Sequence, residues 1–366
     1  MPLTIFTLHS LEIPFKQAFA HATAIRACTE SVLVKAESSK DTVGVGEGCP
    51  RSYVTGETIE TANAFFDSYR SMWEPFTGLD DLRAWMAANQ KPLDANPAGW
   101  CAVELALFDL WGKERGQSLE KLLDLPELTG SFQYSAVLGT ESVGAFQKQM
   151  QQFVALGFTD FKVKITGEFE SDRQKINLLK DNPIKNLRIR VDANNLWKKA
   201  EDAIQYLQRF DYPFFAIEEP LQVGDYEGCR TISQELRIPI ILDENFLRFE
   251  QFQHLQAHPK TWIINLRISK MGGILRSLAI AEQARVLGIP IIIGAQVGET
   301  SILTRAALIV ANQFRDILLA QEGAFGTYLL ERDITEPPLM FGKGGRLDAQ
   351  SISGQPGLGL TLAPST

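Results

Sequence analysis

Five charged residues end successive apolar or β-branched segments of the chain, at intervals of 28, 26, 25 and 27 residues. They are Lys164, Asp192, Glu218, Asp243 and Lys270. Each interval accommodates one strand, one helix and two loops, and charges that end successive strands of a parallel barrel point into one shared mouth. The spacing therefore predicts three carboxylates that converge between two lysines. Because clustered carboxylates need a cation and oxygen ligands suit hard cations, the pattern indicates Mg²⁺.

A simpler interpretation exists for each carboxylate alone, since an acidic residue after a strand commonly caps the next helix. Three such residues in consecutive units favour a shared ligand set instead. The polar loop residues that follow them, such as Asn194, could orient those ligands.

Two lysines share one predicted strand, because Lys162 and Lys164 are two residues apart and their side chains point to the same face. If the two side chains faced the helix layer, they would be buried without partners, which costs free energy. At the mouth of the barrel they would instead lie beside carboxylates. A lysine base near neutrality needs a pKa about two to three units below its usual value of about 10.4. We therefore expect Lys162 to tune and orient Lys164. The alternative is a pair of solvated lysines at an irregular strand end.

The fifth charge, Lys270, is expected at the end of the sixth barrel strand, before the tight turn that Gly272 and Gly273 allow. The sixth strand lies roughly across a barrel from the second, which carries Lys164. The two lysines would then face a substrate from opposite sides, one removing a proton and the other returning it.

The elements that must position these residues fall into two groups. An α+β unit is expected over residues 1–130, with strands at 4–11 and 30–35, a mobile loop at 15–29, and a strand end at 44–48. Its helices are expected at 58–69, 79–88 and 97–114. Residues 131–335 alternate strand and helix, with strands beginning near Phe132, Thr159, Leu187, Phe214, Pro239, Trp262, Pro290 and Ile317. The fold class is therefore α/β: a modified TIM (β/α) barrel with an α+β N-terminal capping domain, and a C-terminal segment, 336–366, returning to pack on the cap.

Composition restricts the functional classes. The net charge of −8 over 366 residues argues against nucleic acid as a partner, and no apolar segment approaches the ~20 residues of a membrane span. The N-terminus has no basic stretch followed by an apolar core, and the four cysteines form no CxxC pair. We therefore expect a cytoplasmic protein that contacts neither nucleic acid nor membrane.

Five short strings contain the charged residues: Lys162-Val-Lys164, Val191-Asp-Ala-Asn194, Ile217-Glu-Glu-Pro220, Leu242-Asp-Glu244 and Lys270-Met-Gly-Gly273. In this order they resemble the enolase superfamily, in particular its muconate lactonizing enzyme subgroup within the mandelate racemase family. The resemblance extends over nearly the whole chain and includes a helix, from Ala102 to Lys113, that links cap to barrel.

The resemblance implies that Asp192, Glu218 and Asp243 bind Mg²⁺, with Mn²⁺ as a substitute, and that Lys164 and Lys270 are the acid/base pair. Glu218 is preferred to Glu219 because the ligand is the first residue of the family's string. It implies an isomerase, either a racemase/epimerase or a cycloisomerase, that abstracts a proton α to the carboxylate of a small substrate through a metal-stabilised enediolate. A homo-oligomer is also expected. The alternatives are a dehydratase or syn-eliminating lyase of the same superfamily, and a non-catalytic metal-binding relic.

Substrate contacts are expected from cap loops and strand ends. The candidates in the cap are Arg26 and Tyr53, with His21 and Thr23 nearby, and those in the barrel are Asn194, Gln296, Glu299 and Glu322. Relatives that epimerise dipeptides resemble one another in an Asp-x-Asp string that binds the substrate amine. Here Ala320 and Glu322 stand at its two acidic positions, which argues against a dipeptide substrate. The Phe325-Gly326 stretch resembles cycloisomerases and acylamino acid racemases instead.

Overall fold

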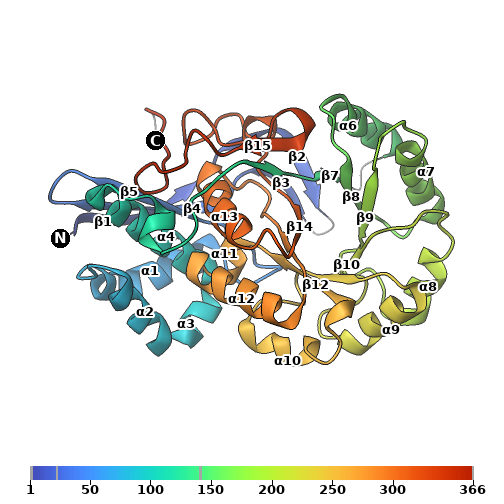
Figure 1. The fold of residues 1–366 in the computed structure, drawn as a ribbon, viewed down its shortest axis with the longest axis horizontal. Helices are drawn as coiled ribbons and strands as arrows, with labels where there is room; N and C mark the ends of the chain where they lie inside the picture. Colours follow the sequence, from blue (N-terminus) through green and yellow to red (C-terminus); the bar gives the residue numbers. More distant parts are fainter. Residues whose placement is uncertain (1–2, 22–23, 140–141, 365–366) are drawn as a thin grey trace.

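The structure, a computed structural model, describes residues 3–21, 24–139 and 142–364. Figure 1 shows a barrel of strands and helices, coloured green to orange, beside an N-terminal layer of strands and helices coloured blue to cyan. The predicted α/β class, a modified TIM barrel with an α+β cap, is confirmed.

Within its described residues, the N-terminal layer contains an antiparallel sheet in the order β1-β4-β5, a separate hairpin and five helices. The sheet strands are β1 (Leu3–Leu11), β4 (Ser31–Ser38) and β5 (Val43–Gly48). The hairpin consists of β2 (Pro14–His21) and β3 (Ala24–Cys28), so most of segment 15–29 is strand and not the expected loop. The mobility expected of this segment stays a prediction. The helices are α1 (Ile59–Trp73), α2 (Leu79–Ala88), α3 (Gln90–Ala95), α4 (Pro97–Arg115) and α5 (Leu119–Leu122).

Three glycines, at alternate positions of β5, let this strand lie directly against helix α4. An added Cβ at these positions would fall 2.0 to 2.2 Å from a backbone carbonyl oxygen of α4. The pairs are Gly44 with Ala106, Gly46 with Ala102, and Gly48 with Ala98. Residues 44–48 are therefore the body of a strand with one glycine face, and not a strand end that enters a loop.

We expect Gly46→Ala to destabilise the protein by about 3 kcal/mol or more, because its methyl group would overlap the Ala102 carbonyl and neither backbone can yield freely. Gly144→Ala is the matched control, since nothing lies within 4 Å of its added Cβ. In helix α6 (Val143–Ala155) that alanine should be neutral or stabilising by up to about 1 kcal/mol. Urea denaturation of both variants measures the difference, and equal stabilities would contradict the close packing of β5 on α4.

Helix α4 is buried along most of its length and carries two buried acids that tie distant segments together. Glu104 accepts hydrogen bonds from the backbone N–H groups of Ile274 and Leu275, in the first turn of helix α12 (Ile274–Leu287). Asp109 accepts from the backbone N–H of Val45 at 3.0 Å and of Leu358 at 2.8 Å. One helix thus joins the cap sheet, the barrel and the C-terminal segment.

Stability should fall as the pH rises through the titration of Glu104, whose pKa is raised by burial to about 8. Between about pH 4.5 and 8 the folded state holds a proton on this carboxyl that the unfolded state has lost, so folding binds a proton. The resulting slope is at most about 1.4 kcal/mol per pH unit. Denaturation at several pH values should give a shallower slope for Glu104→Gln than for the wild type, with the exposed Glu235→Gln as the control. Equal slopes would mean that Glu104 stays charged at the helix N-terminus.

The barrel sheet contains eight parallel strands in the order β14-β13-β12-β11-β10-β9-β8-β7. They are β7 (Ala136–Leu138), β8 (Asp160–Lys164), β9 (Arg188–Asp192), β10 (Ile217–Glu218), β11 (Ile240–Leu242), β12 (Trp262–Leu266), β13 (Ile291–Ile293) and β14 (Leu318–Gln321). Among the described strands no ladder joins β7 to β14, but the Ser135 N–H donates to the Gln321 carbonyl at 2.7 Å across this seam.

The first predicted barrel strand, near Phe132, was misplaced. β6 (Ser131–Gln133) leaves the barrel and pairs antiparallel with β15 (Arg346–Asp348) from the C-terminal segment. The barrel sheet itself begins at β7, which follows β6 after two residues.

Helices alternate with the barrel strands and cover their outer side (Figure 1). The longer ones are α6 (Val143–Ala155), α7 (Phe169–Lys180), α8 (Ala200–Leu207), α9 (Tyr226–Leu236), α12 (Ile274–Leu287) and α13 (Ser301–Gln313). The short ones are α10 (Phe252–Leu255), α11 (Ile268–Met271), η1 (Phe249–Gln251), η2 (Pro259–Thr261), η3 (Gly326–Tyr328) and η4 (Lys343–Gly345). No described helix has the length and hydropathy of a membrane span. The division of the chain at residues 130 and 335 stays a prediction.

Five small or branched apolar residues from neighbouring strands form a separate buried cluster: Ala216, Ile241, Ile263, Ile292 and Ala320. Two residues further along three of these strands come Glu218, Asp243 and Glu322, which are also buried. Side chains two residues apart share one face of a strand. The apolar cluster therefore supports the acidic residues from below, and Ala320, expected at an amine-binding position, belongs to this apolar layer.

Candidate active site

Strand register brings the first three of the five charges together. Lys164 on β8 pairs with Asp192 on β9, and Asp192 in turn pairs with Glu218 on β10. Asp243 directly follows β11, the next strand in the sheet. All four residues are buried. The carboxylates therefore form a row along consecutive strand ends, and their convergence on a cation stays a prediction.

Lys162 lies among three carboxylates. Its Nζ is 2.7 Å from Glu218 Oε1, 3.2 Å from Asp192 Oδ2 and 3.4 Å from Glu322 Oε2. Burial disfavours the ammonium, but the summed attraction of these carboxylates outweighs it and raises the pKa of Lys162. Lys162 is therefore a fixed positive charge, and its influence on Lys164 stays a prediction.

The two candidate acid/base lysines contact opposite ends of the carboxylate row. Lys164 Nζ is 3.0 Å from Asn194 Oδ1 and 3.6 Å from Asp192 Oδ2. Lys270 Nζ donates to Asp243 Oδ1 at 2.9 Å and to the Asp243 carbonyl at 2.8 Å. Burial lowers the pKa of Lys270 despite the opposing attraction of Asp243.

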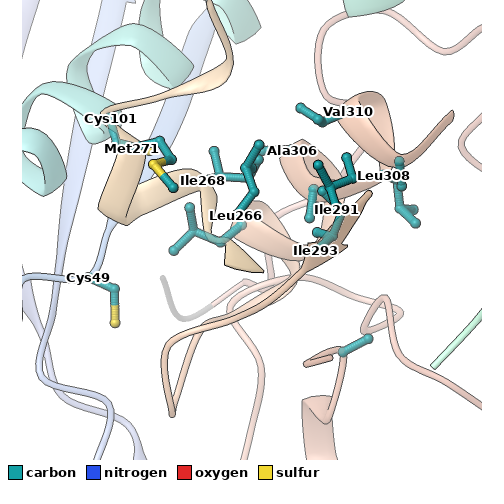
Figure 2. Packing of buried hydrophobic residues seen from close by; sticks show 14 of the residues in the cluster. Cys49, Cys101, Leu266, Ile268, Met271, Ile291, Ile293, Ala306, Leu308 and Val310 are labelled. Atoms are coloured by element: carbon teal, nitrogen blue, oxygen red, sulfur yellow. The ribbon is translucent and has the colours of Figure 1, made fainter. Parts of the chain in front are cut away.

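The sequence had suggested that Lys270 ends a strand, and this was wrong. β12 stops at Leu266, and Lys270 lies in the short helix α11. This helix packs against α4 and α13. Figure 2 shows Met271 of α11 close to Cys101 of α4, and Ile268 close to Ala306 of α13. The cap helix therefore helps to fix the element that carries Lys270.

The residue that directly follows β12 is Arg267, which the sequence analysis missed. Its guanidinium contacts Asp243 Oδ2 and donates to Gln296 Oε1 at 2.8 Å. Burial opposes its charge, but Asp243 and Glu244 outweigh that effect and raise its pKa. A search for charged residues directly after strands would have identified Arg267 if the end of β12 had been predicted at Leu266.

Arg190 is a second missed residue. It is fully buried in β9, two residues before Asp192, and forms ion pairs with Asp160 at 2.7 Å and with Glu322 at 2.6 Å. The two-residue period that linked Lys162 to Lys164 also links Arg190 to Asp192. The same argument applied to β9 would have placed a cation inside the barrel.

Glu219, the next residue after Glu218, anchors the loop that carries Asp243. Glu219 Oε1 accepts from the backbone N–H groups of Asp243 at 2.5 Å and Asn245 at 2.9 Å, and Oε2 accepts from the Asn195 and Asn245 amides. Burial raises its pKa to about 7. Glu219 therefore holds the loop that carries Asp243, and Glu218 is the residue that faces Lys162.

The predicted substrate residues separate into two groups. Tyr53, Gln296 and Glu322 line a cavity of 840 Å³, together with Lys162, Lys164 and Arg267, and Asn194 accepts from Lys164 beside it. Arg26 does not line the cavity: it pairs with Glu30 at 3.0 Å, and its guanidinium carbon lies 5.1 Å from the Tyr53 ring centroid. Glu299 is also outside the lining and accepts from the Gln296 N–H at 2.7 Å. The His21 side chain and Thr23 lie outside the described residues.

The oxygen chemistry of the proposed donor set suits a hard cation, although the side chains are not gathered into a metal-binding group among the described residues. Asp192, Glu218 and Asp243 offer only oxygen, and Glu218 Oε2 is buried without a hydrogen-bond partner. Burial raises the pKa of Glu218 to about 8, which a bound dication would oppose. Within residues 3–21, 24–139 and 142–364, no three His, Cys, Asp or Glu side chains stand close enough to form a metal-binding group. Lys162 and Arg267 contact these carboxylates instead.

Comparisons with known proteins identify relatives that match most of the chain. The model of a family described as enolase C-terminal domain-like matches residues 145–366. The hydrophobic dipeptide epimerase of Enterococcus faecalis is 28% identical over 313 residues, which cover 82% of this chain and 85% of that protein. The N-succinyl-L-Arg/Lys racemase of Bacillus cereus is 23% identical over 314 residues, covering 85% of this chain and 84% of that protein.

Solved structures of relatives share the fold. The crystal structure of the Bacillus cereus racemase matches with a TM-score of 0.86, over 100% of this chain and 96% of that one, at 22% identity. A dipeptide epimerase from Methylococcus capsulatus, complexed with Mg and the dipeptide L-Arg-D-Lys, matches with a TM-score of 0.84 at 25% identity, over 99% and 100% of the two chains. These relatives are isomerases, so the prediction of an isomerase is confirmed.

Proposed function

Because the chain belongs to the enolase C-terminal domain-like family, we propose that it is an Mg²⁺-dependent racemase or epimerase, which acts on the carbon next to a substrate carboxylate. The observation that carries the proposal is the arrangement of two buried lysines at the two ends of one carboxylate row. Lys164 reaches Asp192, and Lys270 reaches Asp243. The names of the relatives, racemase and epimerase, agree with such a pair.

In the proposed reaction, Lys164 and Lys270 exchange a proton with the two faces of the α-carbon. One lysine, in its neutral form, accepts the proton from Cα, and the other, protonated, donates a proton to the opposite face. Asp192, Glu218 and Asp243 would hold Mg²⁺. When bound, the ion would neutralise charge that develops on the substrate carboxylate as the proton leaves.

Other residues of the site would orient these groups and supply fixed charge. Lys162 and Arg267 place positive charge beside the carboxylate row without themselves titrating near neutrality. Glu219 holds the Asp243 loop by four hydrogen bonds. Their preorganised positions would favour a substrate that gains negative charge during the reaction.

The test is incubation with Mg²⁺ in D₂O and a panel of N-acylamino acids and dipeptides, followed by mass spectrometry and chiral separation. We expect deuterium at Cα together with inversion of configuration. Elimination without exchange into recovered substrate would point to a lyase, and no reaction across the panel would count against catalysis of this kind. Use of Mn²⁺ in place of Mg²⁺, and assembly into a homo-oligomer, stay predictions.

A further inference from the structure

A single buried carboxylate holds the loop that follows Lys164. Residues 165–168 connect strand β8, which ends at Lys164, to helix α7, and Asp172 lies in the first turn of that helix. Asp172 Oδ2 accepts hydrogen bonds from the backbone N–H groups of Thr166 at 2.8 Å and Gly167 at 3.1 Å. Its Oδ1 accepts from the Thr166 hydroxyl at 3.0 Å. These three bonds all end within three residues of the proposed base.

A fourth donor comes from the next helix, α8. The Tyr206 hydroxyl donates to Asp172 Oδ2 at 2.7 Å. Burial and this bond raise the pKa of Tyr206, so its hydroxyl keeps the proton that it donates. The Tyr206 ring also packs against Trp197, in the loop after β9, with ring centroids 5.2 Å apart. The carboxylate is fully buried, and such a group is stable only when hydrogen bonds satisfy it. The four donors therefore fix Asp172 and the loop relative to each other.

A buried lysine balances the charge of this carboxylate. Lys175 Nζ lies 3.9 Å from Asp172 Oδ1, a distance too long for a hydrogen bond, and it has no hydrogen-bond partner among the described residues. Lys175 is fully buried, and neither it nor Asp172 lines the 840 Å³ cavity. The ion pair therefore lies behind the site, where it can act on a substrate only through the loop.

The loop after β8 packs against the loop that carries Asn194, the hydrogen-bond partner of Lys164. Gly167, at φ +88°, faces the Leu196 side chain, which would lie 3.1 Å from an added Cβ. Leu196 comes two residues after Asn194, whose Oδ1 accepts from Lys164 Nζ at 3.0 Å. The backbone on which Lys164 lies and the group that holds its ammonium are therefore joined by one packed contact, which Asp172 maintains.

We infer that Asp172 is a positioning residue for Lys164 and that Tyr206 completes its hydrogen bonding. By holding residues 165–168 against the Asn194 loop, Asp172 fixes the direction from which the Lys164 ammonium reaches the substrate. The inference rests on the proposed function, because it concerns the orientation of one of the two proposed acid/base groups. A misplacement of about 1 Å can slow a reaction about 10²-fold, and here that cost would fall on one face of the α-carbon.

The experiment measures α-deuterium incorporation into each pure enantiomer of the test substrates, in D₂O with Mg²⁺. The enantiomer that faces Lys164 is the one whose exchange Lys164→Ala abolishes. For this enantiomer we expect Tyr206→Phe to lower kcat about tenfold and Asp172→Asn to lower it about 10²-fold. KM should not change, because neither residue lines the cavity. Exchange of the opposite enantiomer should stay at the wild-type rate.

Tyr212→Phe is the matched control for Tyr206→Phe. It removes the same group from a tyrosine whose hydroxyl donates to the Leu187 carbonyl at 3.2 Å, directly before β9 and at the opposite end of that strand from Asp192. Both enantiomers should exchange in this variant as in the wild type. Thermal melting of every variant verifies folding.

Asp172→Asn leaves the buried Lys175 without a counter-charge, which can prevent folding. In the double variant Asp172→Asn/Lys175→Met neither charge remains, and we expect the same selective loss of exchange. Tyr206→Phe, which leaves the ion pair intact, gives a second test that does not depend on this double variant.

Hydrogen exchange followed by mass spectrometry measures the loop without any turnover. Protection of the backbone amides of residues 165–168 should fall in Asp172→Asn or in the double variant, because the acceptor of two of these N–H groups has changed. Protection of the amides in β11 should stay as in the wild type and serves as the internal reference.

The outcomes separate this inference from the proposed function. Equal slowing of both enantiomers would mean that Asp172 stabilises the whole site, which would overturn the inference and leave the proposed racemase or epimerase intact. Exchange at the wild-type rate in Tyr206→Phe and in the Asp172 variants would also overturn it, as would unchanged protection of residues 165–168. If the wild type exchanges neither enantiomer of any test substrate, the proposed function fails, and the inference fails with it.

Discussion

Replacing Lys164 or Lys270 by alanine should lower racemisation or epimerisation by about 10²- to 10⁴-fold, the usual contribution of a positioned acid or base. Both lysines are buried at opposite ends of the carboxylate row, so neither can take over the task of the other. Inversion needs proton transfer on both faces of the α-carbon, and each variant lacks one face.

The two variants should also differ in a way that simple misfolding would not produce. Each should still exchange the α-proton of the one enantiomer that its remaining lysine faces, and the two variants should retain opposite enantiomers. Deuterium incorporation into each pure enantiomer in D₂O, followed by mass spectrometry, measures this. Lys185→Ala, an exposed substitution, should behave as the wild type. Racemisation by Lys270→Ala at the wild-type rate would exclude the two-face mechanism.

Removing the metal, or one of its proposed ligands, should have a comparable effect. Chelation with EDTA should abolish α-proton exchange, and Mg²⁺ should restore it. Binding to the folded state alone stabilises a protein by about 2.7 kcal/mol at a ligand concentration 100 times Kd. We therefore expect Mg²⁺ to raise the melting temperature of the wild type, and Glu218→Gln to lose both that rise and the activity, because the substitution replaces the unpartnered buried oxygen Oε2 or its neighbour by an amide.

Glu235→Gln is the matched control for this prediction, since Glu235 is exposed on helix α9. It should keep both the activity and the Mg²⁺-dependent rise in melting temperature. A Glu218→Gln protein that Mg²⁺ still stabilises as much as the wild type would show that the ion binds elsewhere.

The local sequence pattern was sufficient to predict much of the barrel and of the candidate site. Seven of the eight barrel strands lie close to where apolar segments predicted them, and the register places Lys164, Asp192 and Glu218 side by side. These features depend on strand periodicity and on the length of a βα unit, which a sequence displays directly. Where the local signal was weak the predictions failed, as with the strand near Phe132 and the loop at 15–29.

The same limit explains the residues that were missed. Arg190 and Arg267 could have been noticed as charges on interior faces or at strand ends, but their partners, Glu322 and Asp243, are 132 and 24 residues away in the chain. Glu322 was expected only as a substrate contact, and its pairing with Arg190 is visible only once β9 and β14 are positioned in one barrel.

The sequence by itself determined the residue types and their spacing, and therefore the row of carboxylates, the lysines beside it and the family of the fold. Only the tertiary structure decided which charges neutralise one another, that Lys270 lies on a short helix held by the cap, and which residues line the cavity beside the row. The reason is physical: strand periodicity is a local property of the chain, whereas ion pairing and cavity shape depend on distances between segments that only folding brings together.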